Sequence, residues 1–179
     1  MRNLSMMTDF YELTMMNGYS ALGTSGKTAV FDVFFRQQGQ ISYAVAAGLQ
    51  QAIEYINNLH FDEEDIEYLR REAGFGEKFL GELRTFRFTG DIFAVTEGTI
   101  VFPDEPIMIV RAPLSQAQLI EPALLNIINH QTLIATKASR VKKSAGKASV
   151  AEFGLRRAQG PDAGIYGARA SIIGGCSGT

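Results

Sequence analysis

The sequence has little of what disulfide-stapled, membrane-spanning or metal-binding proteins need. Its 179 residues include a single cysteine, Cys176, so no internal disulfide can form, and a reduced, cytoplasmic setting is expected. No run of about 18 uncharged apolar residues occurs, and Asp9 and Glu12 fall where a signal peptide needs an uncharged apolar core. His60 and His130 have no second His or Cys at ligand spacing. These absences predict a soluble intracellular chain with no metal-ligand cluster and no membrane partner.

An excess of charge of one sign is also missing. The chain has 17 Lys and Arg against 19 Asp and Glu, a formal net charge of −2. This near balance argues against whole-surface attraction to nucleic acid or membrane. Hydrophobic residues make up 46% and charged residues 20%, the composition of an ordinary globular protein.

The common short motifs of phosphate binding and nucleophilic catalysis do not occur either. There is no Walker loop, no GxGxxG after a predicted strand and no GxSxG elbow. The loop of type I phosphoribosyltransferases, in which apolar residues lead into paired acids and small residues, is absent too. Any chemistry must therefore come from a less common arrangement.

Hydrophobic periodicity predicts a mixture of helices and short strands. Helices are expected over residues 1–20, 48–59 and 62–73, and strands over 29–35, 41–46, 88–95, 99–102 and 107–110. Because turn residues separate the last three strands closely, we expect them to form a compact β meander.

The longest predicted helix runs from residue 115 to residue 146. Ser115 and Gln118 fit a capping box at its start. No charge occurs between Glu121 and Lys137, which implies burial on most sides. Basic residues crowd its last turns, as the helix dipole favours. We expect this helix to link two structural units.

The last part of the chain predicts a strand–helix–strand unit. A strand is expected over 149–155, a small-residue helix over 163–170 and a further strand from Ile172, which is typical of a parallel sheet. One such unit cannot bury its own sheet faces, so we expect the N-terminal part of a longer protein. The predicted class is α/β, with an α+β N-terminal domain over 1–114, the linking helix over 115–146 and, over 147–179, a truncated first βαβ unit.

Three short segments have an unusual composition. Residues 8–14 combine polar and aromatic side chains, residues 152–160 place a ring and two guanidiniums after a predicted strand, and residues 174–179 form a Gly-rich loop. Ligands of parallel sheets and barrels bind at the carboxyl ends of strands, where the last two segments fall.

Taken in order, the segments resemble nicotinate phosphoribosyltransferase, a type II phosphoribosyltransferase. The resemblance runs over essentially the whole chain. It is carried by TDFYELTM (8–15), AVFDVFFR (29–36), YAVAAGL (43–49), FTGDIFAVTEGTIVFPDEPIMIV (88–110), LLNIINHQTLIATKASR (124–140), EFGLRRAQGPDA (152–163) and GARASIIGGCSGT (167–179).

The resemblance implies a defined reaction in NAD salvage. Ribose 5-phosphate passes from phosphoribosyl diphosphate to nicotinate, giving nicotinate mononucleotide and diphosphate, and ATP hydrolysis is coupled through a phosphorylated histidine that is not His130. Such an enzyme counts as both a glycosyltransferase and a ligase, and Mg²⁺ on diphosphate or ATP fits it. The implied fold is an α/β N-terminal domain on an incomplete, mostly parallel α/β barrel. The implied active site is shared between the two subunits of a homodimer.

The resemblance also implies roles for individual residues. Phe153 would stack on the pyridine ring, with Leu155 next to it. Tyr11 and Asp9 would come from the neighbouring subunit, and Arg156 would pair with the phosphate or the nicotinate carboxylate. Further contacts to substrate are implied for Arg36, Arg157, Gly175, Ser177, Gly178 and Thr179, and Lys137 and Arg140 are weaker phosphate-binding candidates.

Two questions stay open at this point. Strand alternation puts Phe153, Leu155 and Arg157 on one face and Arg156 on the other, but a strand that ends at Leu155 lets either arginine turn into the site; the resemblance favours Arg156. The function also has alternatives, namely a non-catalytic interaction module of the same fold, a transferase for nicotinamide or quinolinate, or one half of an enzyme completed by a C-terminal chain.

Overall fold

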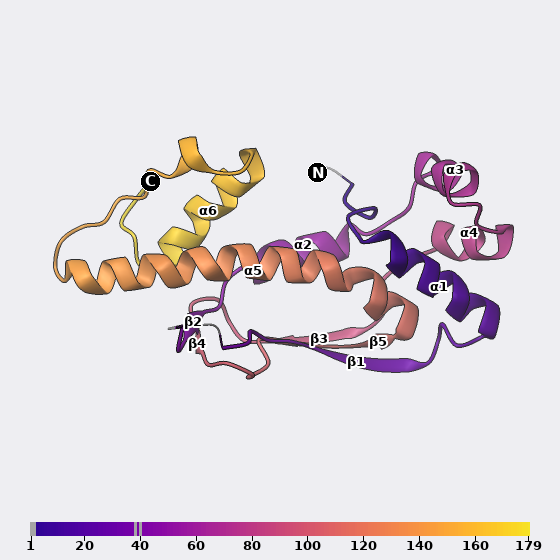
Figure 1. Cartoon of the computed structure of the whole chain (residues 1–179), viewed down its shortest axis with the longest axis horizontal. Coiled ribbons are helices and arrows are strands. Elements are labelled where there is room, and N and C mark those ends of the chain that lie inside the picture. The colour runs from indigo at the N-terminus through magenta and orange to yellow at the C-terminus, as the bar shows by residue number, and fades with distance from the viewer. Residues whose placement is uncertain (1–2, 38, 40) are drawn as a thin grey trace. The chain divides into compact units, whose positions relative to one another are not determined.

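The computed structural model of the chain describes residues 3–37, 39 and 41–179 and contains both helices and strands (Figure 1). The α-helices are α1 (Phe10–Leu22), α2 (Leu49–Asn57), α3 (Glu63–Glu72), α4 (Glu77–Arg84), α5 (Leu114–Ala145) and α6 (Pro161–Ile173), with a 3₁₀ turn η1 (Leu155–Arg157). The strands are β1 (Thr28–Val33), β2 (Ala44–Val45), β3 (Asp91–Ala94), β4 (Ile100–Val101) and β5 (Met108–Pro113). The predicted α/β class is confirmed.

The chain folds into two compact units. Unit 1 consists of Met1–Phe31, Ile53–Ile92 and Ile109–Leu124, and unit 2 of Asp32–Ala52, Phe93–Met108 and Leu125–Thr179. This division differs from the three consecutive parts expected from the sequence, because the chain passes repeatedly from one unit to the other. That residues 147–179 begin a barrel stays a prediction.

The strands pair differently from the expected meander. One sheet has the order β1-β5-β3, whereas β4 pairs with β2 in a separate antiparallel ladder, with Ala44 opposite Val101 and Val45 opposite Ile100. The meander over 88–110 is therefore wrong. The Gly98 turn explains the change, because Ala46 N donates to Thr99 O at 2.9 Å and Gly98 N donates to Ala46 O at 2.8 Å. These bonds place β4 against β2.

Unit 1 has a core built around aromatic side chains. The rings of Phe75 and Phe79 meet edge to face at 5.2 Å, and those of Phe61 and Phe86 at 5.9 Å. Helix α3 begins as its acidic first turn predicts. Asp62 and Asp65 form a reciprocal capping box there, with bonds of 2.9 and 3.1 Å.

The long predicted helix is α5, within one residue of the expected bounds. The predicted capping box at Ser115 and Gln118 is wrong, since the helix already starts at Leu114 and the buried Ser115 hydroxyl has no hydrogen-bond partner among the described residues. The uncharged middle of α5 is buried on most sides as expected, with Ala135 fully enclosed, while Leu125 and Leu133 form an exposed side. Among the helices of the described residues, none has the length and apolar character to cross a membrane.

Helix α5 also satisfies the backbone of the β2 segment in unit 2. Val45 N donates to Thr136 Oγ1 at 2.9 Å, and Ala47 N donates to Thr132 Oγ1 at 3.2 Å. The Thr132 hydroxyl in turn donates to Ala47 O at 3.1 Å. Two buried threonines one turn apart thus take the place of a second neighbouring strand, on the edge of β2 that β4 does not cover.

Candidate active site

The structure brings two of the three candidate segments together at the end of the chain. Ser177 N donates to Val150 O at 2.8 Å, and Glu152 N donates to Gly178 O at 2.9 Å, so that Ala151 and Gly178 form a parallel bridge (Figure 1). Helix α6 connects these two segments. The predicted helix between two parallel-paired segments is therefore present, but the pairing is a single bridge and neither segment forms a strand.

The strands themselves are much shorter than expected. The predicted strand 149–155 reduces to the bridge at Ala151, and Ile172 and Ile173 are the last residues of α6 instead of the start of a strand. The cause lies in the packing of small residues. Gly174 lies so close to α5 that an added Cβ would be 2.4 Å from Ala135 O. This close packing lets α6 continue to Ile173 before the chain turns.

The aromatic and basic side chains of the first segment are exposed. Phe153 is 74% exposed and Leu155 66% exposed. Arg156 and Arg157 are exposed on η1, and the described residues offer neither of them an ion pair. Because these residues form a 3₁₀ turn, the alternation argument for a strand does not apply to them. Which arginine faces the substrate stays open.

The Gly-rich loop at the end of the chain has a fixed backbone and an accessible outer side. Gly175 has a φ of +100°, a conformation that side chains rarely adopt, and lies against the Lys142 side chain. Cys176 is buried, and its N–H donates to Ser171 O at 3.0 Å. In contrast, Ser177 and Thr179 are exposed, and Gly178 is half-buried. The loop can therefore present backbone and hydroxyl groups to a ligand.

The third candidate segment lies at the start of α1 in unit 1. Asp9 is the N-cap residue, and Tyr11 is 54% exposed. Glu12, which the sequence patterns do not single out for chemistry, is fully buried, and its Oε2 accepts a hydrogen bond from Gln118 Nε2. Its Oε1 has no partner among the described residues. Tyr11 and Asp9 are therefore presented outward from a helix that Glu12 ties to α5.

Hydrogen bonding raises the pKa of Tyr11 most, and burial raises the pKa of Glu121 most. A hydrogen bond with Glu12, followed by the charge of Glu12, burial and the charges of Glu121 and Asp9, raises the pKa of Tyr11 to about 12. Burial, then the charges of Glu12 and Asp9, raise the pKa of Glu121. Tyr11 thus stays protonated at neutral pH and can act as a neutral aromatic surface and hydrogen-bond donor.

The remaining predicted cations lie elsewhere in unit 2. Arg36 is exposed, with its guanidinium carbon 5.7 Å from the Phe34 ring centre, and Lys137 is exposed on α5. The Arg140 guanidinium lies 5.0 Å from the ring centre of Tyr43. Hydrogen bonding to Ser139 and, to a smaller extent, to Arg140 lowers the pKa of Tyr43. No described contact joins these cations to the Phe153 segment.

The segment around the site has a strong positive bias. Between Lys137 and Arg169 the sequence contains eight Lys and Arg but only two acids, Glu152 and Asp162. Such a field favours phosphate and carboxylate groups. In the part of the chain that the structure describes, no group of three or more His, Cys, Asp or Glu is arranged to hold a metal ion.

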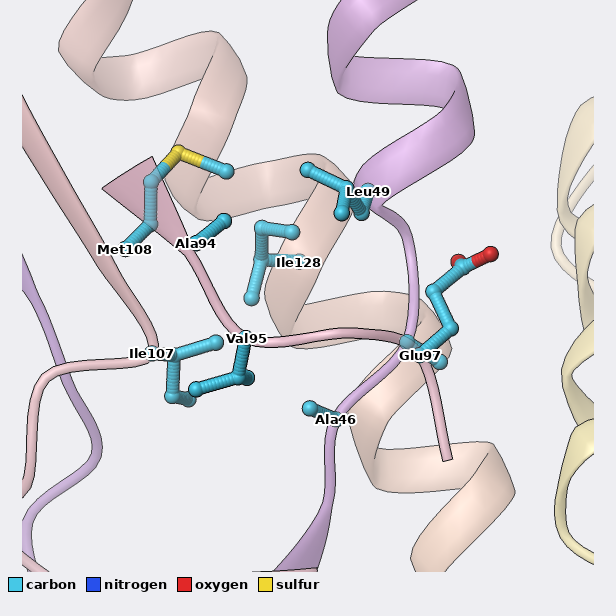
Figure 2. A pocket seen from close by; sticks show the side chains of 9 residues that line it. Ala46, Leu49, Ala94, Val95, Glu97, Ile107, Met108 and Ile128 are labelled. Carbon is cyan, nitrogen blue, oxygen red and sulfur yellow. The ribbon is translucent and has the colours of Figure 1, made fainter. Parts of the chain in front are cut away.

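A small pocket in unit 2 does not coincide with the predicted residues. It is lined by apolar side chains that include Ala46, Val95, Ile107 and Ile128, with Glu97 at its edge (Figure 2). Its cavity volume is about 10 Å³, far below the range of about 300–1,000 Å³ that small-molecule sites occupy. The Glu97 carboxylate instead pairs with Arg169 of α6 at 2.5 Å, a contact that the sequence patterns do not reveal.

Comparisons with known proteins agree with each other. The sequence model of the nicotinate phosphoribosyltransferase (NAPRTase) N-terminal domain matches residues 6–129. Nicotinate phosphoribosyltransferase of Bacillus subtilis (strain 168) is 50% identical over 99% of this chain and 36% of its own length. Nicotinate phosphoribosyltransferase pncB2 of Mycobacterium tuberculosis (strain CDC 1551 / Oshkosh) is 45% identical over 98% of this chain and 38% of its own length.

A solved structure extends the similarity to three dimensions. The crystal structure of human nicotinic acid phosphoribosyltransferase superposes with a TM-score of 0.86 at 33% identity, over 94% of this chain and 35% of the human one. The chain thus spans about a third of the length of the relatives that it matches.

Proposed function

Because the chain belongs to the nicotinate phosphoribosyltransferase family, we propose that it takes part in the transfer of ribose 5-phosphate from phosphoribosyl diphosphate to nicotinate. The products would be nicotinate mononucleotide and diphosphate, in the salvage of NAD. The observation that carries the proposal is the parallel pairing of Ala151 with Gly178. It places the exposed Phe153 segment beside the exposed Gly-rich loop, within a strongly cationic stretch of a chain 50% identical to a named nicotinate phosphoribosyltransferase.

The pyridine ring would be held by aromatic stacking. Phe153 offers an exposed ring on a segment whose backbone is fixed by the bridge, and Leu155 lies next to it. Stacking contributes roughly 1 kcal/mol beyond the burial of area. Tyr11 and Asp9 of a neighbouring subunit would cover the opposite side of the ring and the ribose.

The reaction requires charge stabilisation more than covalent participation of the protein. Cleavage of the bond from ribose C1 to diphosphate produces an oxocarbenium-like transition state, while negative charge moves onto diphosphate. Arg156, with Arg157 as the alternative, would pair with the phosphate or the carboxylate through its planar fork. Arg36, Lys137 and Arg140 would extend the positive field, and Ser177, Gly178 and Thr179 would bring backbone and hydroxyl donors close to the substrate.

Mg²⁺ and ATP belong to the proposal on chemical grounds. Mg²⁺ binds largely through phosphate oxygens and water and supplies charge neutralisation at diphosphate without needing a cage of side chains. ATP would be the coupled substrate. The residues of this chain suited to the anions of both are the exposed arginines Arg156 and Arg157.

The part of the family fold that this chain spans favours a second candidate function. About a third of the relatives' length is covered, so this portion alone would act as a non-catalytic module of the fold. In an active enzyme it would then work together with further barrel residues, in a homodimer with shared sites or with a complementary C-terminal chain. A preference for nicotinamide or quinolinate remains the alternative in substrate choice.

Calorimetric titration of the purified chain with nicotinate mononucleotide tests the proposal. We expect binding that Arg156→Met weakens at least tenfold and that Arg157→Met weakens less. Arg111→Met is the matched control, because the ion pair that the described residues offer Arg111 is an exposed one with Asp91 in unit 1. Absence of binding by the unaltered chain, together with a lone 19.6 kDa species in native mass spectrometry, would favour the non-catalytic module.

A further inference from the structure

Helix α6 packs in unit 2 mainly through small residues. Its buried residues are Gly164, Gly167, Ala170 and Ser171. Of its large apolar side chains, Ile165 is 63% and Ile172 47% exposed, whereas Ile173 is half-buried against the core around Ala135 and Ala170. Hydrophobic stabilisation scales with the apolar area removed from water, so burial holds this helix less firmly than a face of large apolar side chains would.

A forked ion pair fixes the orientation of α6. Arg169, in the middle of α6, donates from Nη1 to Glu97 Oε1 at 2.8 Å and from Nη2 to Glu97 Oε2 at 2.5 Å. Two parallel bonds between planar groups fix orientation as well as distance. Figure 2 shows the Glu97 carboxylate pointing away from the apolar side chains of the pocket, on the side where the ribbon of the C-terminal part lies.

Both partners of the ion pair are themselves held in place. Glu97 Oε1 also accepts from Gly48 N at 2.7 Å, at the start of α2. Arg169 Nη1 donates to the fully buried Gln131 of α5 at 3.0 Å, and Nη2 donates to Gln50 Oε1 at 3.0 Å. Gln131 in turn donates to Gln51 Oε1 at 2.7 Å. The network thus connects the turn before β4, the start of α2, the middle of α5 and α6.

The position of α6 sets the geometry of the candidate site. In the sequence, α6 connects the segment 150–157 to the loop 174–179. In space, the hydrogen bonds of Glu152 N and Ser177 N join these two segments. At its start the Leu155 side chain occupies the space over Gly164, and at its end Gly174 contacts α5. A displacement of α6 would therefore disturb both halves of the site and the bonds between them.

We propose that the Glu97–Arg169 pair, with Gln131, is a positioning device that fixes α6 and thereby aligns the Phe153 segment with the Ser177–Thr179 loop. Neither residue contacts substrate; both act through the helix. The alignment of the two segments stands on the contacts of this chain, and only its consequence for ligand binding rests on the proposed function.

Amide hydrogen exchange of the purified chain tests the alignment without any ligand. In Arg169→Met, we expect the amides of Glu152 and Ser177 to exchange at least tenfold faster, while the amide of Val45, which is bonded to Thr136, is unchanged. Arg169→Lys keeps the charge but loses the fork, and we expect it to restore less than half of the lost protection. Arg111→Met, which removes an exposed ion pair in unit 1, is the control and should leave all three amides unaffected.

Two results would overturn the proposal. One is unchanged exchange at Glu152 and Ser177 in Arg169→Met, and the other is equal acceleration at Val45, which would make the pair a general stabiliser. Glu97→Gln should reproduce the local effect, because it leaves Gly48 bonded but removes the charge.

A second titration separates this proposal from the proposed function. With nicotinate mononucleotide as the probe, we expect Arg169→Met to weaken binding at least fivefold. If the unaltered chain does not bind the probe, the proposed function fails while the exchange result still decides the role of the pair. If the chain binds and Arg169→Met binds equally well, alignment by this pair does not matter for the ligand and the proposal fails at that step.

Discussion

At the scale of single residues, the candidate site consists of side chains that contribute little to the fold. Phe153, Leu155, Arg156 and Arg157 are all exposed, and the described residues give neither arginine an ion pair. Because these side chains lie mostly in water, the fold depends little on their packing. Substitution at these positions should therefore separate binding from stability.

Replacement of Phe153 tests this separation. We expect Phe153→Ala to change the free energy of unfolding by less than about 0.5 kcal/mol, because the ring is mostly in water. The same change should weaken binding of nicotinate mononucleotide about fivefold or more, as the loss of roughly 1 kcal/mol of stacking requires. Urea unfolding and calorimetric titration measure the two quantities. Phe93→Ala, at a ring that is 61% exposed outside the site, is the control and should leave binding intact.

The Glu97 carboxylate gives stability a defined dependence on pH. Its hydrogen bonds with Arg169, and then with the Gly48 amide, lower the pKa of Glu97 in the folded chain. The unfolded chain therefore takes up a proton first as the pH falls, so the contribution is complete above the ordinary Glu pKa of about 4.3 and is lost as the pH falls through the folded value.

Glu97→Gln should accordingly be less stable than the unaltered chain at pH 7, with a difference that shrinks as the pH falls below about 4. Urea unfolding at a series of pH values measures this difference. A difference that stays constant from pH 7 to pH 3 would show that the charge of Glu97 does not contribute.

At the scale of elements, close approach between helices and strands determines the arrangement of unit 2. Helix α6 meets α5 through glycine and alanine, and the β2 segment meets α5 through threonine hydroxyls. Contacts of this kind leave no room for an added methyl group and no water to replace a lost hydrogen bond. They should therefore be sensitive to very small changes.

Gly174→Ala tests the contact between α6 and α5. An added Cβ would lie 2.4 Å from Ala135 O and 2.6 Å from Ala138 Cβ, so the helices must separate. We expect a loss of about 1–3 kcal/mol in the free energy of unfolding, as for other overpacked contacts. Gly18→Ala in α1 is the matched control. Nothing lies within 4 Å of its added Cβ, and alanine should stabilise the helix by up to about 1 kcal/mol. Thermal unfolding distinguishes the expected loss of stability in Gly174→Ala from the expected gain in Gly18→Ala.

Thr136→Val tests the hydroxyl bond to β2. The valine keeps the shape but leaves the buried Val45 N–H without its acceptor, which is now 2.9 Å away. We expect a cost of about 1–3 kcal/mol, the desolvation penalty of an unpaired buried donor. Thr136→Ser retains the hydroxyl and should recover most of that loss in urea unfolding. Equal stability of the two variants would contradict this role.

At the scale of the whole molecule, charge is distributed unevenly along a chain that is nearly neutral overall. The formal net charge is −2, yet the segment from Lys137 to Arg169 has eight basic residues and two acids. The acids of the chain gather instead around α1, α3 and α4 of unit 1. The proposed transfer of a phosphoribosyl group would gain from such a local positive field.

Binding of inorganic diphosphate should therefore depend strongly on ionic strength. We expect the affinity of the chain for diphosphate to fall at least tenfold between about 0.05 and 0.5 M NaCl, because added salt shortens the screening length from roughly 14 to 4 Å. Titration at four salt concentrations measures the slope. A double variant, Arg156→Met with Arg157→Met, should flatten that slope, whereas Arg70→Met in unit 1 should not change it.

Much about this protein is determined by its sequence alone. The order of its segments predicts the nicotinate phosphoribosyltransferase family, which the comparisons confirm. Local periodicity predicts the bounds of α5 to within one residue, and the acidic first turn predicts the start of α3 at Asp62. These helix bounds depend on residues within one or two helical turns, so the local sequence is enough to predict them. The eight-residue α4 gives too short a pattern among the glycines around it, and no prediction covers it.

The tertiary structure alone decides which distant residues meet. Ile100 pairs with Val45 instead of with a strand of the expected meander. Leu155–Arg157 forms a 3₁₀ turn where a strand was predicted, and Glu12 is fully buried. Arg169 forms its ion pair with Glu97, which lies 72 positions away in the sequence. Each outcome depends on the space and the hydrogen-bond partners that other elements leave, and no local pattern records these. The sequence therefore predicts the family, while the bridge between Ala151 and Gly178 depends on tertiary contacts.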